Sequence, residues 1–487
     1  MTKTVIDASS EKRTGYRKWS LLARLYSVFM RSFVQRVLIP RFASSERVRD
    51  GRNQWAFLSE QTGINPAGLN QSQSEAHRIW WHAASVGELE ILWPIMVRIA
   101  EEAAQEREPG QDSSKSAVEF VVTILSESAK ERLEKLNTAL SKLGMPVVFS
   151  GYCPWEGDWT AALSVLEPDL FITSKYEAWP ELWMGLEERQ IPLLIVSAKD
   201  RRSLRLCRGI CRALGAALPD MSLFAAISED LPGLKKNFPQ ARVEMVGEPR
   251  WDQVWNRAQA GSPRAKELAA AMQELPRPWG VLGSAWSEDV GLWNGYLQKV
   301  ARAPAYSSAH TSDQALIDSL GSVLIVPHRI DSEHVQEIED VLKKGNVEFV
   351  RTSDFKSAQE LREALKRHSA VRCLIVNEMG FLSELYSVAD WAYVGGGIGR
   401  RGVHSTIEPA IHGIPISCGT YRAHQFVEIA ELRSTGQMTL IRSEAELEHW
   451  VNGLKSASQN RDRWRAEAMR RLGATERLSQ RVLGMLH

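Results

Sequence analysis

Three short segments combine charged side chains with glycine or proline directly after an apolar run. They are His82-Ala-Ala-Ser-Val-Gly-Glu88, Lys175-Tyr-Glu-Ala-Trp-Pro180 and Gly247-Glu-Pro-Arg-Trp-Asp252. A carboxylate at Glu88 is suited to take a proton from a hydroxyl group as a general base, and Lys175 and Glu177 are candidates for the same crevice. The guanidinium of Arg250 is suited to hold a carboxylate or a phosphate. Glu88, Glu177 and Arg250 are therefore the first candidates for chemistry.

Each segment also has a purely structural interpretation. Ser85 and Glu88 have the S-x-x-E spacing of a capping box, in which each side chain satisfies a free backbone N–H at the start of a helix. Charged residues after a strand, such as Lys175 and Glu177, often serve only to solvate a loop. The residues alone leave both interpretations open.

The carboxyl-terminal half contains a second set of candidates. Gly283-Ser-Ala-Trp286 and Pro327-His328-Arg329 end apolar runs, and Asn377-Glu-Met379-Gly380-Phe381-Leu382 opens a helix whose first N–H groups are suited to an anion. Gly397-Ile-Gly-Arg-Arg-Gly402 fits G-x-G-x-x-G, yet no acidic residue follows about 20 positions later to bind a dinucleotide ribose. We therefore reject a dehydrogenase; simple turn glycines remain the alternative.

The sequence contains no HExxH motif, Cys/His cluster or Walker loop, so we expect no metal and no cofactor. The Arg-rich tail from Glu444 has no interleaved aromatic residues, so we expect a solvated helical face and no nucleic-acid partner.

The elements that must position these residues follow from an alternation of short β-branched runs with helical stretches. In the first half of the chain these runs are RIWWHAA, VEFVVTIL, PVVFS, DLFITS, PLLIVSA, FAAIS and VEMVG. In the second half they are VLGS, SVLIVPH, VEFVR, RCLIVN and WAYVGGG. This pattern predicts an α/β protein with two doubly wound parallel sheets. A hydrophobic content of 44% in 487 residues is enough for two sizeable cores.

The pattern also predicts domain boundaries. We expect an N-terminal segment over 1–45, a Rossmann-like domain over 46–257, a Pro/Gly/Ser-containing linker over 258–280, a second Rossmann-like domain over 281–440 and a helical tail over 441–487.

The N-terminal segment is basic and amphipathic. Between Lys12 and Arg41 there are eight Lys or Arg residues and no Asp or Glu. On a helix, Ser20, Arg24, Ser27, Arg31 and Gln35 form one polar stripe, and Leu21, Leu22, Leu25, Phe29 and Phe33 cover much of the rest. Such a helix is suited to lie in a membrane surface. A helix packed on the protein is the alternative.

Taken in order, the segments HAASVGE, KYEAWP, GEPRWDQV, GSAWSED, VPHR, NEMGFLSELY, GGGIGRRGVHSTIEPA and HGIPISCGTYRAHQFVE resemble the successive motifs of the Kdo transferases of lipopolysaccharide assembly. The resemblance spans residues from about 20 to 440. It implies the GT-B fold, two Rossmann-like domains facing a central crevice, and an N-terminal membrane anchor. It further implies an inverting glycosyltransferase that moves Kdo from CMP-Kdo to a lipid A precursor on the cytoplasmic face of the inner membrane.

The resemblance assigns a role to each candidate residue. It makes Glu88 the general base and gives Glu177 and Arg250 transition-state stabilisation. The CMP-contacting segments correspond to His328, Arg329, Met379, Gly380, Phe381, Ser405, Thr406, Ile407 and Glu408. The sequence departs from the usual pattern at several of these positions: Arg250 replaces Lys, His328-Arg329 replaces Arg-His, Asn377 and Phe381 replace Asp and Glu, and Ser405 replaces Asn.

Two other functions fit the same residues. One is a GT-B transferase or epimerase that uses a UDP-sugar, which the identity of the released nucleotide would distinguish. The other is a catalytically inactive, membrane-associated binding protein, against which the presence of Glu88 argues.

Overall fold

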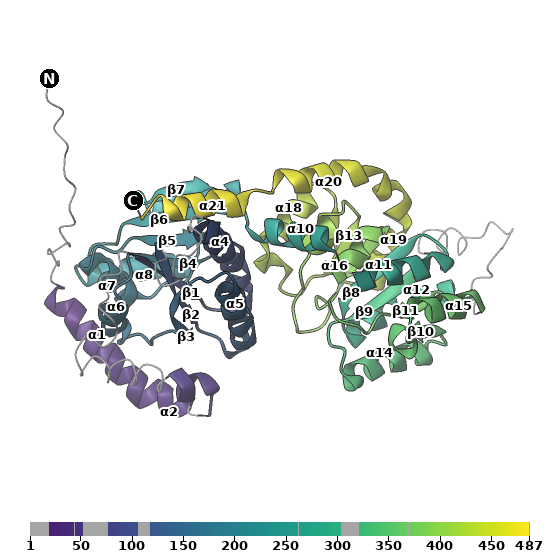
Figure 1. Ribbon diagram of the computed structural model, residues 1–487, viewed down its shortest axis with the longest axis horizontal. Coiled ribbons are helices and arrows are strands. Elements are labelled where there is room, and N and C mark those ends of the chain that lie inside the picture. Colours follow the sequence, from purple (N-terminus) through teal and green to yellow (C-terminus); the bar gives the residue numbers. More distant parts are fainter. Residues whose placement is uncertain are drawn as a thin grey trace, which may run out of the picture. The chain divides into compact units, whose positions relative to one another are not determined.

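The computed structural model describes residues 19–42, 44–51, 76–105, 117–261, 263–302, 321–367, 371–380 and 382–486. The chain divides into two compact units (Figure 1). The first comprises Met1–Pro249 and Gly473–His487, and the second comprises Arg250–Leu472.

The first unit is built on a seven-stranded parallel sheet in the order β3-β2-β1-β4-β5-β6-β7. Its strands are β1 (His77–Ala83), β2 (Val118–Ile124), β3 (Val147–Tyr152), β4 (Leu170–Ser174), β5 (Leu193–Val196), β6 (Met221–Ala225) and β7 (Arg242–Met245). Its helices are α4 (Val86–Gln105), α5 (Lys130–Lys142), α6 (Trp159–Leu166), α7 (Pro180–Glu188), α8 (Arg202–Ala213), α9 (Leu231–Asn237) and α21 (Ala474–Leu483). The strand order reverses between β1 and β4, as in doubly wound folds.

Helices cover both faces of this sheet, with α4 and α5 on one side and α6, α7 and α8 on the other (Figure 1). Neighbouring strand residues therefore enter different cores. Trp81 packs against Phe120 in the core under α4 and α5, whereas Trp80 packs against Trp159 and Phe171 in the other core. Burial on both faces explains why these strands read as continuous apolar runs in the sequence.

The second unit contains another seven-stranded parallel sheet, in the order β10-β11-β9-β8-β12-β13-β14. Its strands are β8 (Trp279–Ala285), β9 (Ser322–Pro327), β10 (Phe349–Arg351), β11 (Cys373–Ile375), β12 (Trp391–Val394), β13 (Ile416–Gly419) and β14 (Met438–Ile441). Its helices are α10 (Arg250–Ala260), α11 (Pro263–Ala271), α12 (Ser287–Arg302), α14 (Ser332–Lys344), α15 (Ala358–Arg367), α16 (Leu382–Val388), α17 (Ile407–Ala410), α18 (Val427–Ser434), α19 (Glu444–Ala457) and α20 (Arg461–Arg470). Here the strand order reverses between β8 and β12.

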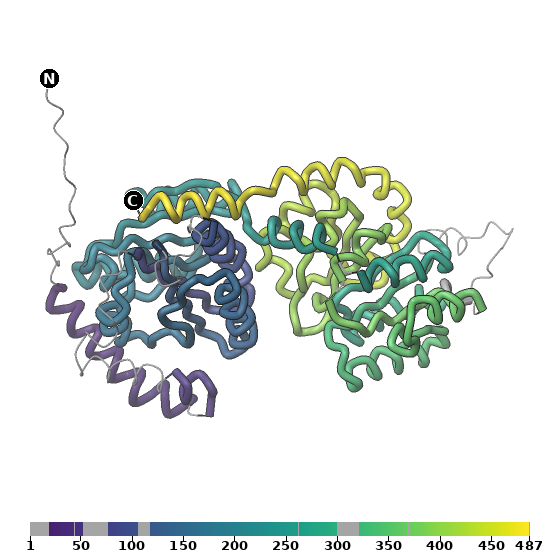
Figure 2. The backbone as a smooth tube through the Cα atoms, in the orientation of Figure 1, coloured from purple at the N-terminus to yellow at the C-terminus, as the bar shows by residue number. Residues whose placement is uncertain are grey.

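Two of the expected boundaries require correction. Residues 258–280, expected as a linker, contain the end of α10, α11 and the start of β8, and Leu268 and Trp279 are buried in the core of the second unit. The expected tail over 441–487 is split between the units. Its last helix, α21, runs along α4 in the first unit (Figure 2), where Leu478 and Val482 are fully buried. Apolar residues placed every fourth position in a charged segment produce this packing.

The N-terminal helix α1 (Leu21–Phe33) continues through a π-helical turn (Val34–Leu38) into α2 (Ile39–Arg41). Its polar stripe, not its apolar one, faces the first unit. Tyr26 donates a hydrogen bond to Glu156 (3.0 Å) and Ser27 donates one to Glu181 (2.9 Å). The helix approaches Gly157 so closely that a Cβ at this position would collide with the backbone of Arg31.

The apolar face of α1 points away from the protein. Leu21, Leu22, Leu25, Val28 and Phe29 are each more than half exposed. The helix thus docks through polar contacts and through Ala23, which is buried in a core of the first unit, and its apolar side is uncovered by the described residues. No helix within the described ranges has the length and apolarity needed to cross a membrane.

Candidate active site

The loops after β1 and β4 meet at the carboxyl edge of the first sheet, where the strand order reverses. The β1 loop leads to Glu88 in the first turn of α4, and the β4 loop carries Lys175 and Glu177. In doubly wound sheets, this switch point is the place where ligands bind. The fold therefore brings two of the predicted segments together.

Glu88 is 5% exposed and serves as a helix cap as well as a candidate base. Ser85 Oγ donates a hydrogen bond to its Oε2 (3.3 Å), and the carboxylate also accepts from the backbone of Ala84 and Ser85. Burial raises the pKa of the Glu88 carboxyl, and the charge of Lys175 opposes this rise. A buried carboxylate with a raised pKa is a stronger base than an exposed one.

Glu177 lies within electrostatic range of Glu88. Trp179 Nε1 donates a hydrogen bond to Glu177 Oε1 at 2.8 Å, which orients the carboxylate. Burial, followed by the charge of Glu88, raises the pKa of Glu177 to about 7. Because the two carboxylates repel each other, their protonation is coupled.

Arg47 is a site residue that the sequence did not indicate. Its guanidinium lies 3.6 Å from the centre of the Trp155 ring and 3.7 Å from Cys153 Sγ, beside the end of β3. The positive charge of Arg47 lowers the pKa of Glu177 and so opposes the rise that burial causes. The buried Nε of Arg47 has no hydrogen-bond partner among the described residues. No motif marks this arginine, since the site acquires it only through the tertiary fold.

His82 does not compete with Glu88 for the role of base. Its imidazole is fully buried, and Nδ1 lies 3.1 Å from Thr123 Oγ1. Burial and the charge of Arg47 lower the pKa of His82 to about 3. The ring is therefore neutral at physiological pH and has no exposure to a substrate.

In the second unit, three rings gather after β8, β9 and the glycine-rich loop that follows β12. The rings of His328 and His404 stack with their centres 4.0 Å apart, and Trp286 lies 4.8 Å from His328. Arg401 covers Trp286 at 3.6 Å. Burial lowers the pKa of His328 and brings that of His404 to about 4, so both imidazoles are neutral at physiological pH. The rings of His328, His404 and Trp286 form an aromatic surface with polar ring nitrogens, and this surface lies at the switch point of the sheet.

The other predicted nucleotide-binding residues lie in different environments. Arg329 is exposed and donates to Asp331 (3.0 Å), while Met379 is 74% exposed beside Gly380, whose φ is +99°. Phe381 lies outside the described residues.

The segment Ser405–Glu408 leads into α17. Thr406 and Ile407 are buried, and the hydroxyl of Thr406 has no hydrogen-bond partner in the described part of the chain. Glu408 faces Arg257 of α10 at 3.8 Å. The exposed hydroxyl of Ser405, the buried hydroxyl of Thr406 and the carboxylate of Glu408 are the polar side-chain groups of this segment.

Arg250 begins α10 and belongs to the second unit. Its guanidinium donates to both oxygens of Glu428, at 3.4 and 3.1 Å, and the Glu428 side chain is 1% exposed. This bidentate ion pair orients the guanidinium of Arg250, and the carboxylate of Glu428 balances its positive charge. Glu428 is the last residue of the segment HGIPISCGTYRAHQFVE, in which no site residue was predicted.

No cluster of His, Cys, Asp or Glu with metal-binding geometry occurs in the described ranges.

Comparisons with known proteins find similarity to the family that the motifs resemble. Residues 57–253 match the family model described as 3-deoxy-D-manno-octulosonic-acid transferase, or Kdo transferase. The chain is 25% identical to the 3-deoxy-D-manno-octulosonic acid transferase of Haemophilus influenzae, across 81% of this chain and 83% of that protein. It is 24% identical to the enzyme of the same name from Chlamydia muridarum, across 87% and 86% of the two chains.

The fold has solved counterparts as well. A UDP-GlcNAc 2-epimerase from Neisseria meningitidis superimposes with a TM-score of 0.50 and 14% identity, covering 84% of this chain and 99% of that one. At this identity the similarity concerns the fold alone, two parallel α/β sheets of the GT-B type. The family model over residues 57–253 and the two curated relatives make this chain similar to the Kdo transferases over most of its length.

Proposed function

We propose that this protein transfers Kdo from CMP-Kdo to a lipid A precursor, with inversion, at the cytoplasmic face of the inner membrane. The observation that carries the chemistry is the pair of buried carboxylates, Glu88 and Glu177, at the switch point of the first sheet, with Lys175 beside them. The proposal that the transferred sugar is Kdo rests on the similarity to the relatives named above.

In this mechanism Glu88 takes the proton of the acceptor hydroxyl as the new glycosidic bond forms. Positive charge then develops on the sugar, and the ionised Glu177 stabilises it. Negative charge develops on the departing phosphate, for which Arg250 and Arg329 supply guanidinium groups. CMP leaves as a stable anion, so no second carboxylic acid is needed to protonate it, unlike in a glycosidase.

The direct test is incubation of the purified protein with CMP-Kdo and a tetraacylated lipid A precursor, followed by mass spectrometry. We expect product heavier by whole Kdo residues and stoichiometric release of CMP. A reaction supported by a UDP-sugar and releasing UDP would contradict the donor assignment, and absence of transfer with every donor would indicate a binding protein.

Glu408 should contribute to CMP binding, because the resemblance places this carboxylate on the ribose hydroxyls. We expect Glu408→Ala to weaken CMP binding by about 1.5–3 kcal/mol, the usual contribution of a hydrogen bond to a charged group. Calorimetric titration with CMP measures the change, and Glu288→Ala, an exposed carboxylate in the first turn of α12, is the matched control. An unchanged dissociation constant for Glu408→Ala would remove this residue from the site.

The exposed face of α1 should hold the enzyme on the bilayer. Leu25 and Phe29 are 56% and 64% exposed, and Arg24 on α1 and Arg36 in the following π-helical turn offer positive charge to anionic lipid. Each such apolar side chain contributes about 1.5–3 kcal/mol when fully buried. We expect Leu25→Asn/Phe29→Asn to reduce vesicle binding at least about tenfold.

Sedimentation with anionic vesicles measures this binding. Leu206→Asn on α8, where the leucine is 59% exposed, provides the control for loss of an exposed apolar residue elsewhere. If the α1 variant sediments like the wild type, the helix is not the membrane contact.

A further inference from the structure

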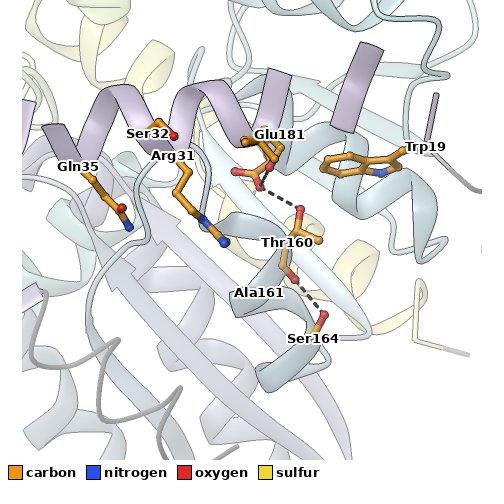
Figure 3. A pocket seen from close by; sticks show the side chains of 10 residues that line it. Trp19, Arg31, Ser32, Gln35, Thr160, Ala161, Ser164 and Glu181 are labelled. Atoms are coloured by element: carbon orange, nitrogen blue, oxygen red, sulfur yellow. Dashed lines mark hydrogen bonds between the residues drawn. The ribbon is translucent and has the colours of Figure 1, made fainter. Parts of the chain in front are cut away.

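A cavity of about 410 Å³ lies between α1 and the helices α6 and α7 of the first unit (Figure 3). It is separate from the carboxylate pair described above, whose residues do not line it. One wall carries Arg31 and Ser32 of α1 and Gln35 of the following π-helical turn, and the opposite wall includes Thr160 and Ser164 of α6.

The α1 wall presents hydrogen-bond donors. Arg31 is held through Nε, which donates to Gly157 O (3.0 Å) and pairs with Asp158 (3.0 Å), so its terminal amino groups extend along the cavity (Figure 3). Ser32 and Gln35 follow within one helical turn and line the same space, and neither side chain has a hydrogen-bond partner in the described ranges. A guanidinium, a hydroxyl and an amide on one turn form a donor set that suits a phosphate.

The acidic residue of the cavity is already engaged. Glu181 accepts hydrogen bonds from Ser27 (2.9 Å), from Thr160 (3.1 Å) and from the backbone N–H groups of Gly157 and Trp159. Four donors therefore surround its two oxygens. Burial also raises the pKa of Glu181, which disfavours its charged form. Its repulsion of an anion bound to Arg31 is correspondingly reduced.

The position of the cavity suits a lipid head group. An amphipathic helix at a membrane surface buries its apolar face about 5–10 Å into the boundary between head groups and acyl chains. On α1 this face is the exposed side with Leu25 and Phe29, whereas the cavity opens on the protein side of the same helix and shares Val28 with it. The donors of Arg31 and Gln35 would thus lie at the level of the phosphates.

We propose that this cavity binds the phosphodiester of a bilayer phospholipid, held by Arg31, Ser32 and Gln35. The inference rests on the membrane attachment of α1 proposed above. A head group bound here connects α1, α6 and the lipid surface, and so fixes the orientation in which the first unit stands on the bilayer.

The test is calorimetric titration of the full chain with dihexanoyl phosphatidylglycerol below its micelle concentration, with inorganic phosphate in a parallel titration. We compare Arg31→Gln with Arg202→Gln, which removes the same charge from an exposed position of α8 outside the cavity. The uncharged pair Ser32→Ala/Gln35→Ala leaves the net charge and the Arg31 contacts intact. It therefore remains informative if Arg31→Gln alters the docking of α1.

We expect saturable lipid binding by the wild type and Arg202→Gln, weakened at least about tenfold by Arg31→Gln and by Ser32→Ala/Gln35→Ala. Equal weakening by both arginine variants, with no effect of the uncharged pair, would show diffuse charge attraction and overturn the proposal. So would binding of inorganic phosphate as tight as that of the lipid. Displacement of the lipid by a phosphorylated acceptor would assign the cavity to the acceptor instead.

Failure of this proposal can be distinguished from failure of the membrane attachment. If α1 does not contact lipid, Leu25→Asn/Phe29→Asn keeps wild-type vesicle binding. If the cavity alone is misassigned, that variant still loses vesicle binding, while the Ser32→Ala/Gln35→Ala pair titrates with lipid like the wild type.

Discussion

Glu88→Gln is expected to reduce Kdo transfer by about 10²–10⁴-fold, the range typical for loss of a general base. The amide has the shape of the carboxylate and can still accept the hydrogen bond from Ser85, so the start of α4 should be preserved. The thermal melt and CMP binding should therefore match those of the wild type.

The matched control is Glu90→Gln, two residues further along α4. Glu90 pairs with Arg132 of α5 and is not part of the carboxylate pair. Single-turnover transfer assays with both variants separate loss of the base from general damage to the helix. Turnover of Glu88→Gln within about tenfold of the control would contradict the role of Glu88.

The dependence of the transfer rate on pH provides a second test of the roles proposed for Glu88 and Glu177. Both Glu88 and Glu177 must be ionised to act, and burial raises both pKa values, that of Glu177 to about 7. Protonation on acidification removes the charges, so the rate should fall as the pH drops through about 7 rather than near 4.5. Because the two groups are coupled, this acidic limb belongs to the pair and should shift downward in Glu88→Gln, where the neighbouring charge is gone.

The sequence was most informative where a candidate catalytic residue comes shortly after a buried strand. The runs RIWWHAA and DLFITS form β1 and β4, and parallel pairing of these strands places the loops with Glu88 and Glu177 at one edge. The strands β13 and β14 were not predicted, since each lies between charged or glycine-rich segments. The packing of α21 on the first unit could not be predicted either, because local periodicity does not say which core a helix joins.

Residues recruited to the site by tertiary contacts were missed for a related reason. Arg47 lies more than 100 residues from Trp155, over whose ring it stacks, and Trp286 lies far along the chain from His404, to which it donates. Neither pair has a spacing that a motif can encode. The polar stripe of α1 was predicted correctly as a stripe, but periodicity cannot tell which side faces the protein; hydrogen bonds to Glu156 and Glu181 decide it.

The second large effect is expected from the Arg250–Glu428 pair. Arg250→Met should lower transfer by about 10²–10³-fold, as expected when a donor that stabilises developing charge is removed. It should also lower the free energy of unfolding by about 3–5 kcal/mol, because Glu428 is left buried without its partner charge. Arg250→Lys keeps a cation at this position, as the usual family pattern has it, and should retain measurable transfer.

The double variant Arg250→Met/Glu428→Gln separates the two roles of the arginine. It replaces the ion pair with two uncharged side chains, so no buried charge is uncompensated and most of the lost stability should return. Transfer should stay as low as in Arg250→Met, because the positive charge is still missing. Chemical denaturation and single-turnover assays on the four proteins of this cycle give both quantities. Recovery of transfer together with stability would show that Arg250 acts only as a structural partner of Glu428.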